Sequence, residues 1–178
     1  MKIFFDMDGT LSEFKLVGPS EWAAPGYARG LNPILSVVTA LKRFIAIPTY
    51  FGEKVEVFIC SAVVSMDFAV EDKIYWLKEQ GINLPKENLI FVPYGKSKAE
   101  ALAERGITIE SGDLFLDDYT KNLIDLRKID NLTPVKLLNG INDTNKTWGF
   151  DRVSAFSCPA TIQKQLMGIS RMAKMFAA

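Results

Sequence analysis

The chain has 178 residues, 48% of them hydrophobic, and its 21 basic residues balance its 21 acidic residues. This length and apolar content suit one globular domain over residues 1–178. Proteins that wrap nucleic acid or coat an anionic membrane usually carry an excess of basic residues. The zero net charge of this chain argues against both classes. No apolar run approaches the roughly 20 residues that span a bilayer. Asp6 and Asp8 interrupt the first apolar run too early for a signal peptide.

The first predicted strand is the apolar run 1–5, which leads directly into Asp6-Met7-Asp8-Gly9-Thr10. The next twenty residues are irregular and rich in glycine and proline. We interpret residues 12–30 as a small lid or cap inserted after the first strand. Its aromatic side chains are Phe14, Trp22 and Tyr27, and their roles as lid packing or substrate stacking both stay open.

Apolar spacing and turn residues predict an alternation of helices and strands through the rest of the chain. The predicted strands are 55–60, 89–92, 114–116 and 134–138, and the predicted helices are 33–45, 71–80, 97–105, 122–128 and 159–175. The stretch between the fifth strand and the last helix is read as irregular, with Trp148 as a core or loop anchor. This alternation predicts an α/β, three-layer Rossmann-like fold: a mostly parallel, five-stranded sheet with helices on both faces.

Polar side chains follow three of the predicted strands where each strand ends. Asp6 and Asp8 follow the first strand, Ser61 the second, and Asp117 and Asp118 the fourth. The carboxyl ends of parallel strands meet at one edge of a sheet, where ligands bind in open α/β folds. Several carboxylates brought together there do not all stay ionised without a cation. We therefore expect Mg²⁺ held by Asp6, Asp8 and Asp117.

The scarcity of histidine and cysteine limits the kinds of catalytic and metal site that the chain can form. Histidine is absent, and Cys60 and Cys158 are the two cysteines. Serine–histidine and cysteine–histidine mechanisms and zinc sites are thereby excluded, and an oxygen-ligated hard cation is favoured. Two cysteines build no disulfide framework, so we expect a reducing, cytoplasmic location. Cys60 ends an apolar strand and is read as a small buried hydrophobic residue.

A hydroxyl and a lysine beside a metal suit a phosphate group, by hydrogen bonding and by charge. Lys73 is placed near the start of the helix after the second strand, and Lys96 and Lys98 follow the third. Lys96 and Lys98 are interpreted as surface or phosphate-steering residues, and a direct role in the site is the alternative for either. Metal, phosphate and a free carboxylate together indicate phosphoryl transfer through an aspartyl phosphate.

These motifs resemble those of the haloacid dehalogenase superfamily. The matching pieces are Asp6-Met7-Asp8-Gly9-Thr10, the strand that ends at Ser61, a lysine, and Leu116-Asp117-Asp118. Within it, the chain is similar to the 5′(3′)-deoxyribonucleotidase family, of the pyrimidine, cytosolic C type. That closer resemblance rests on Pro25-Gly26-Tyr27 with Leu31-Asn32-Pro33-Ile34, Val57-Phe58-Ile59-Cys60-Ser61, Asp72-Lys73-Ile74-Tyr75-Trp76-Leu77, and Gly112-Asp113 through Asp118. This resemblance implies the Rossmann-like fold of haloacid dehalogenase proteins. It also implies that the cap of this chain is much smaller than the cap of the deoxyribonucleotidase family.

The resemblance implies roles for the aspartates. Asp6 would attack phosphorus, and Asp8 would act first as general acid and then as general base. Asp6, the main-chain carbonyl of Asp8, and Asp117 would hold Mg²⁺, with Asp118 behind them.

It also implies a phosphate site. Thr10, Ser61 and the amide of Ala62 would bind the phosphate. Lys73 would neutralise the aspartate–phosphate pair. Lys96 is the reserve candidate, because many superfamily members place this lysine after the third strand.

Three functions follow from this pattern. The leading one is a Mg²⁺-dependent phosphomonoester hydrolase, a 5′-nucleotidase acting on (deoxy)nucleoside monophosphates. The second keeps the machinery but takes a sugar phosphate or another small phosphorylated metabolite. The third is a non-hydrolytic phosphoacceptor like a response-regulator receiver, and Asp8, placed to activate water, argues against it. The expected partner is a small phosphorylated molecule, with no nucleic acid and no membrane, and a homodimer is left open.

Overall fold

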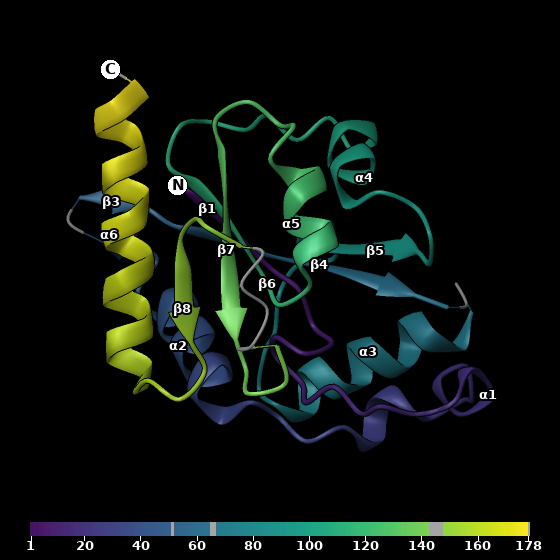
Figure 1. The fold of residues 1–178 in the computed structure, drawn as a ribbon. Helices are drawn as coiled ribbons and strands as arrows, with labels where there is room; N and C mark the ends of the chain where they lie inside the picture. Colours follow the sequence, from purple (N-terminus) through teal and green to yellow (C-terminus); the bar gives the residue numbers. More distant parts are fainter. Residues whose placement is uncertain (51, 65–66, 143–147, 178) are drawn as a thin grey trace.

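The computed structural model describes residues 1–50, 52–64, 67–142 and 148–177, and its centre is a sheet of six parallel strands (Figure 1). The strand order is β5-β4-β1-β6-β7-β8. These strands are β1 (Lys2–Phe5), β4 (Glu56–Val63), β5 (Leu89–Pro93), β6 (Asp113–Asp117), β7 (Leu132–Leu138) and β8 (Arg152–Ser154). A separate antiparallel pair, β2 (Thr49–Tyr50) with β3 (Glu53–Lys54), precedes β4.

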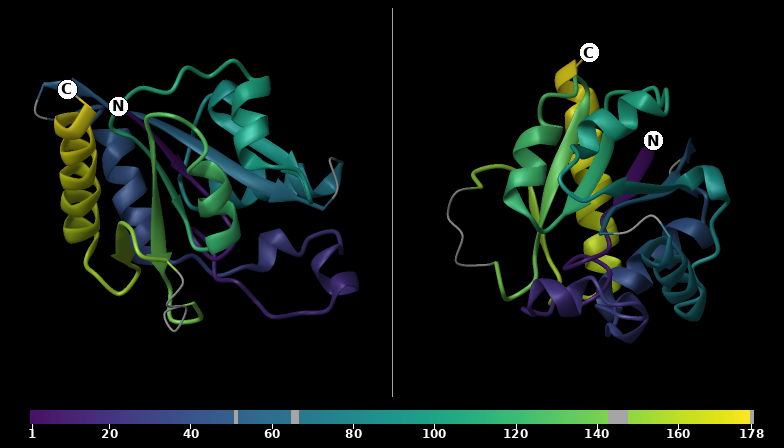
Figure 2. Two further views of the ribbon diagram at one scale, coloured as in Figure 1. Left: turned by 45° about the horizontal axis from the view of Figure 1, so that its top comes forward. Right: turned by 90° about the vertical axis from the view of Figure 1, so that its right-hand side faces the viewer.

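Helices cover both faces of this sheet. The described helices are α1 (Pro19–Trp22), α2 (Leu35–Ala46), α3 (Phe68–Glu79), α4 (Lys98–Glu104), α5 (Thr120–Leu126) and α6 (Pro159–Ala177), with 3₁₀ turns η1 (Ala28–Gly30) and η2 (Lys86–Asn88). Figure 2 shows α4 and α5 on the opposite side of the sheet from α2 and α3. Along β1 the side chains alternate, so Ile3 and Phe5 pack with α2, α3 and α6, whereas Phe4 joins the cluster that contains residues of α4 and α5.

The sheet has its topological switch point at β1. From β1 the chain adds β4 and then β5 on one side. It then crosses to place β6, β7 and β8 on the other. Ligands of open α/β sheets bind at the carboxyl ends of the strands beside such a point. The strand ends of β1 and β6 are therefore where the fold itself favours a site.

The predicted fold class is confirmed: the protein is α/β, with a parallel sheet between two helical layers. The expected number of strands was wrong, because β8 adds a sixth. β8 is three residues long, and Val153 is its one buried side chain, so it shows no apolar run. The second predicted strand also ended too early, since β4 continues through Ser61 to Val63 by pairing with β5.

The segment between β1 and α2 contains only α1 and η1, and it lies along α3. Asp72 of α3 is buried and accepts hydrogen bonds from the Gly26 amide and the Arg29 Nε, both at 2.5 Å. The Trp76 indole donates to the Leu31 carbonyl at 2.7 Å. Within the described ranges, no helix combines the length and apolar character that crossing a membrane requires.

Candidate active site

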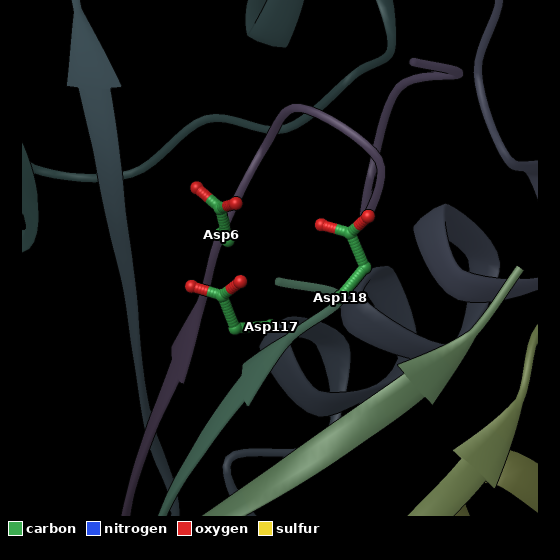
Figure 3. A group of neighbouring side chains, drawn as sticks. All are labelled: Asp6, Asp117 and Asp118. Carbon is green, nitrogen blue, oxygen red and sulfur yellow. The ribbon is translucent and has the colours of Figure 1, made fainter. Parts of the chain in front are cut away.

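Three carboxylates gather at the carboxyl ends of β1 and β6. Asp6, Asp117 and Asp118 each offer an oxygen, and these oxygens lie within 4.8 Å of one another. Figure 3 shows the three side chains rising together from the ends of two neighbouring strands. The structure therefore brings together three of the four aspartates that sequence reasoning selected.

The strand register explains this arrangement. β1 and β6 are parallel neighbours with Phe5 opposite Leu116, so the next residues, Asp6 and Asp117, come out side by side. The Asp6 amide donates to the Leu116 carbonyl at 2.9 Å, which continues the ladder up to the first carboxylate. Asp6 and Asp117 are both buried.

Gly9 is required by the loop that follows. Its φ is +78°, and a Cβ built there would lie 2.3 Å from the Asp118 Oδ2. Any other residue would be strained in this conformation and would push Asp118 away. The Asp-x-Asp-Gly order therefore has a steric basis.

Lys98 is a site residue for which the sequence favoured a role outside the site. Its Nζ lies 2.8 Å from an Asp6 oxygen and 2.7 Å from an Asp117 oxygen, and its side chain is only 4% exposed. The prediction of a surface or steering role for it was wrong. Ser97 accepts a hydrogen bond from the Glu100 amide as an N-cap, so Lys98 begins α4. The serine N-cap marks where α4 begins, but no sequence signal shows which of the two nearby lysines faces the carboxylates.

Lys96, the reserve candidate, does not reach the carboxylates. Its side chain is 56% exposed, and its Nζ lies 3.9 Å from Glu104 on the surface. The turn between β5 and α4 directs Lys96 to solvent, and two residues later the helix directs Lys98 inward.

Lys73 of α3 contacts a second group of site residues, Asp8 and Ser61, which Lys98 does not contact. Its Nζ donates to the Asp8 Oδ2 at 2.5 Å and to the Ser61 Oγ at 2.8 Å. β4 extends past the point where β1 ends, which carries Ser61 up beside Asp8. The predicted group of Asp8, Ser61 and Lys73 is thus assembled.

Of the two other predicted phosphate ligands, Ala62 and Thr10, only Ala62 borders a cavity beside Asp8. Ala62 lines a small cavity together with Asp8 and Lys73. Thr10 is fully buried, and its Oγ1 has no hydrogen-bond partner among the described residues. Its hydroxyl is not among the groups that line this cavity.

The same cavity lies under the segment of α1 and η1. Its space is about 20 Å³, which is room for about one water molecule. Trp22 and Tyr27 line it from above and Phe68 from α3. Trp22 also packs edge-on against Tyr94, with ring centroids 4.8 Å apart, so α1 contacts the loop after β5. Two of the three predicted lid aromatics therefore border the cavity, whereas Phe14 is 40% exposed and does not.

Burial and mutual repulsion shift the pKa values of these groups. Burial raises the pKa of Asp6 to about 6, against the attraction of Lys98. Burial, with the nearby charges of Asp117 and Asp6, raises the pKa of Asp118 to about 8. Burial would lower the pKa of Lys98, but the carboxylates of Asp117 and Asp6 outweigh it and raise that pKa.

A hard divalent cation fits this donor set. Three carboxylates with oxygens within 4.8 Å of one another meet only one direct lysine partner among the described residues, Lys98. The group is therefore short of positive charge, and its ligand atoms are all oxygens. Mg²⁺ prefers such ligands.

A first prediction concerns pH. Asp6 and Asp118 keep their protons to pH values of about 6 and about 8 in the folded protein, against an ordinary 3.8. Between 3.8 and about 8 these two carboxyls bind more protons in the folded chain than in the unfolded chain, so their contribution to metal-free stability falls as pH rises. A cation displaces these protons. We expect Mg²⁺ to raise the melting temperature more at pH 8.5 than at pH 6, measured by thermal melts with EDTA or Mg²⁺. An equal increase at both pH values would contradict this.

The remaining sequence predictions concern single residues away from the carboxylates. Cys60 is fully buried, and burial raises its pKa to about 12, as suits a small core residue. Trp148 is buried, and its indole donates to the Asp151 carbonyl at 2.9 Å, so it anchors the stretch before β8.

Comparison with known proteins adds little to this picture. No protein-family model and no curated protein matches the chain. Among solved structures, one similar chain is DsGPDH of Dunaliella salina, with 19% identity and a TM-score of 0.46. The match covers 76% of this chain and 23% of that one, so the protein described here spans about a quarter of its length.

Proposed function

We propose that this protein is a Mg²⁺-dependent phosphomonoester hydrolase that works through an aspartyl phosphate. The proposal is supported mainly by one group of charged and polar side chains at the switch point of the sheet. Asp6, Asp117 and Asp118 lie together with Lys98, beside the contacts that join Lys73 to Asp8 and Ser61. The resemblance to the haloacid dehalogenase superfamily, and within it to the deoxyribonucleotidases, gives these residues their order in the reaction.

In the proposed first half-reaction, an Asp6 oxygen attacks phosphorus. The bond from phosphorus to the leaving oxygen breaks, and Asp8 donates a proton to that oxygen. Asp8 suits this role because its side chain is 19% exposed and lines the cavity, whereas the Asp6 side chain is 7% exposed and held by Lys98. Mg²⁺, held by Asp6, Asp117 and the Asp8 carbonyl with Asp118 behind them, would neutralise charge on the phosphoryl oxygens.

In the second half-reaction, Asp8 takes a proton from water as the water oxygen attacks phosphorus. The bond between phosphorus and Asp6 breaks, which releases inorganic phosphate and restores the Asp6 carboxylate. Lys73 and the Ser61 hydroxyl are placed to bind the phosphate, since one lysine joins both Ser61 and Asp8.

We infer that the substrate is a (deoxy)nucleoside 5′-monophosphate, because Trp22 and Tyr27 border the space beside Asp8 and offer faces for a base. A nucleoside needs far more than the 20 Å³ between the lid and α3, so the lid must move aside to admit it. The small space favours a second candidate, a sugar phosphate or similar metabolite whose leaving group extends past the lid.

A substrate panel tests the proposal. Purified protein is assayed for phosphate release from nucleoside 5′-monophosphates and sugar phosphates, with Mg²⁺ and with EDTA. We expect turnover that requires Mg²⁺, with kcat/KM highest for a nucleotide. A higher kcat/KM for a sugar phosphate would select the second candidate, and no turnover of any monoester would refute both.

A second prediction concerns the lid. Arg29→Met removes the ion pair with buried Asp72 but leaves Lys73 and its contacts with Asp8 and Ser61 in place. We expect KM for a nucleotide to rise about 3- to 10-fold, equivalent to about 1 kcal/mol. kcat for a small aryl phosphate should stay within about twofold. Arg127→Met is the control, because Arg127 stacks on Phe150 outside the lid. Equal losses on both substrates would indicate damage to α3 instead.

The proposal includes a cytoplasmic, reducing location. Both cysteines are free, Cys60 in the core and Cys158 exposed. An exposed free thiol is compatible with a reducing compartment.

A further inference from the structure

The loop after β7 contacts the carboxylate group, and neither the sequence motifs nor the proposed chemistry uses it. Asn139 donates from its Nδ2 to the Gly9 carbonyl at 2.8 Å and to the Asp118 Oδ2 at 3.1 Å. Both partners are acceptors, so the NH₂ of the amide must face them. One side chain thus ties the loop after β1 to the end of β6.

Asp118 depends on this contact more than Asp117 depends on any single one. Asp117 is held by Lys98, by the Tyr119 amide at 2.8 Å and by Asn122 at 3.0 Å. Within the described part of the chain, Asn139 alone donates a hydrogen bond to the Asp118 carboxylate.

Asn139 is itself held in place by its own loop. Its Oδ1 accepts from the amides of Ile141 at 3.2 Å and Asn142 at 3.3 Å, and its own amide donates to the Asn142 Oδ1 at 3.1 Å. Asn142 in turn donates from its Nδ2 to the carbonyls of Asp118 at 2.8 Å and Leu137 at 2.9 Å. The two asparagines hold each other, and between them they fix both the backbone and the side chain of Asp118.

We propose that Asn139 is a positioning residue that orients Asp118 for the divalent cation, with Asn142 fixing its geometry. The proposal rests on the function proposed above. Hydrogen-bonded groups behind the ligands of a metal fix the orientation of the site, and loss of such a group typically costs roughly 10- to 100-fold in metal affinity or activity. Asn139 acts through Asp118 and Gly9 and is not placed to touch substrate.

The test is Mg²⁺ binding to the metal-free protein by calorimetry at pH 8.5, with no substrate present. Asn139→Ala is expected to raise the Mg²⁺ dissociation constant roughly 10- to 100-fold. Asn142→Ala leaves the Asn139 amide in place, and a smaller rise is expected. Asn83→Ala, at an exposed asparagine, is the matched control and should bind Mg²⁺ as the wild type does.

Turnover gives a second readout. For Asn139→Ala, the Mg²⁺ concentration for half-maximal activity should rise by the same factor as the dissociation constant, while kcat at saturating Mg²⁺ returns to within about threefold of wild type. A purely structural role would lower the melting temperature in EDTA and leave the dissociation constant unchanged, which would overturn the inference. If Asn139→Ala does not fold, Asn139→Ser takes its place, and unchanged Mg²⁺ affinity in it overturns the inference equally.

These outcomes separate the inference from the proposed function. Wild-type protein that binds Mg²⁺ but hydrolyses no monoester refutes the proposed function. The Mg²⁺ dissociation constants of wild type and Asn139→Ala then still test the inference. Wild type and Asn139→Ala with equal Mg²⁺ affinity refute the inference alone. Wild type that binds no Mg²⁺ overturns both.

Discussion

Asp6→Asn is expected to abolish phosphate release while the protein stays folded. Asparagine has the shape of aspartate, but it is a poor nucleophile and a weaker cation ligand. Loss of a covalent nucleophile costs several orders of magnitude in kcat, and we expect at least roughly 10³-fold here. Lys98 keeps its second partner, Asp117, at 2.7 Å, so the fold should persist.

The measurements are turnover and the chemical trapping of an acyl phosphate. Wild type quenched during turnover should carry phosphate on Asp6 that hydroxylamine releases, and Asp6→Asn should carry none. Asp130→Asn, at an exposed aspartate, is the control and should keep full activity. Turnover that survives Asp6→Asn would exclude the covalent route. A long-lived aspartyl phosphate in the wild type would instead favour a phosphoacceptor module.

Lys98→Met is expected to cause the largest loss of stability among these variants. It leaves Asp6 and Asp117 buried without their shared cation, and breaking a buried ion pair costs about 3–5 kcal/mol. The loss should be larger at high pH, because burial raises the pKa of Asp6 to about 6, and a protonated Asp6 needs the lysine less than an ionised one. Mg²⁺ should restore part of the stability by replacing the missing charge.

Chemical denaturation in EDTA and in Mg²⁺, at pH 6 and pH 8.5, measures these effects. Lys96→Met is a matched control two residues away, at an exposed side chain whose ion pair is worth at most about 1 kcal/mol. Similar losses in both variants would show that Lys98 is not the cation that balances Asp6 and Asp117.

Much of the site could be predicted because its residues are placed by strand ends. Asp6 and Asp117 follow apolar runs directly, and the parallel register of β1 and β6 then sets them side by side. Ser61 was selected for the same reason, although β4 continues beyond it to Val63. The Gly9 turn is equally local, since its positive φ is a property of the backbone.

The residues that were missed or assigned a role outside the site depend on tertiary contacts instead. Lys98 and Lys96 differ little in sequence context, and only the start of α4 decides which one faces the carboxylates. Asn139 lies 130 positions from Gly9 in the chain, and no local pattern marks that contact. β8 was missed because it depends on pairing with β7, and it has little apolar character of its own.

The position of β1 has a consequence for hydrogen exchange. β1 is bonded to β4 on one side and β6 on the other, so its amides should exchange only through global unfolding. The lid segment is tied down mainly by Asp72, Trp76 and Tyr94, and it should open locally at a much lower cost in free energy. Under the proposed function, substrate would enter and product would leave through openings of the lid that leave the spacing of Asp6 and Asp117 unchanged.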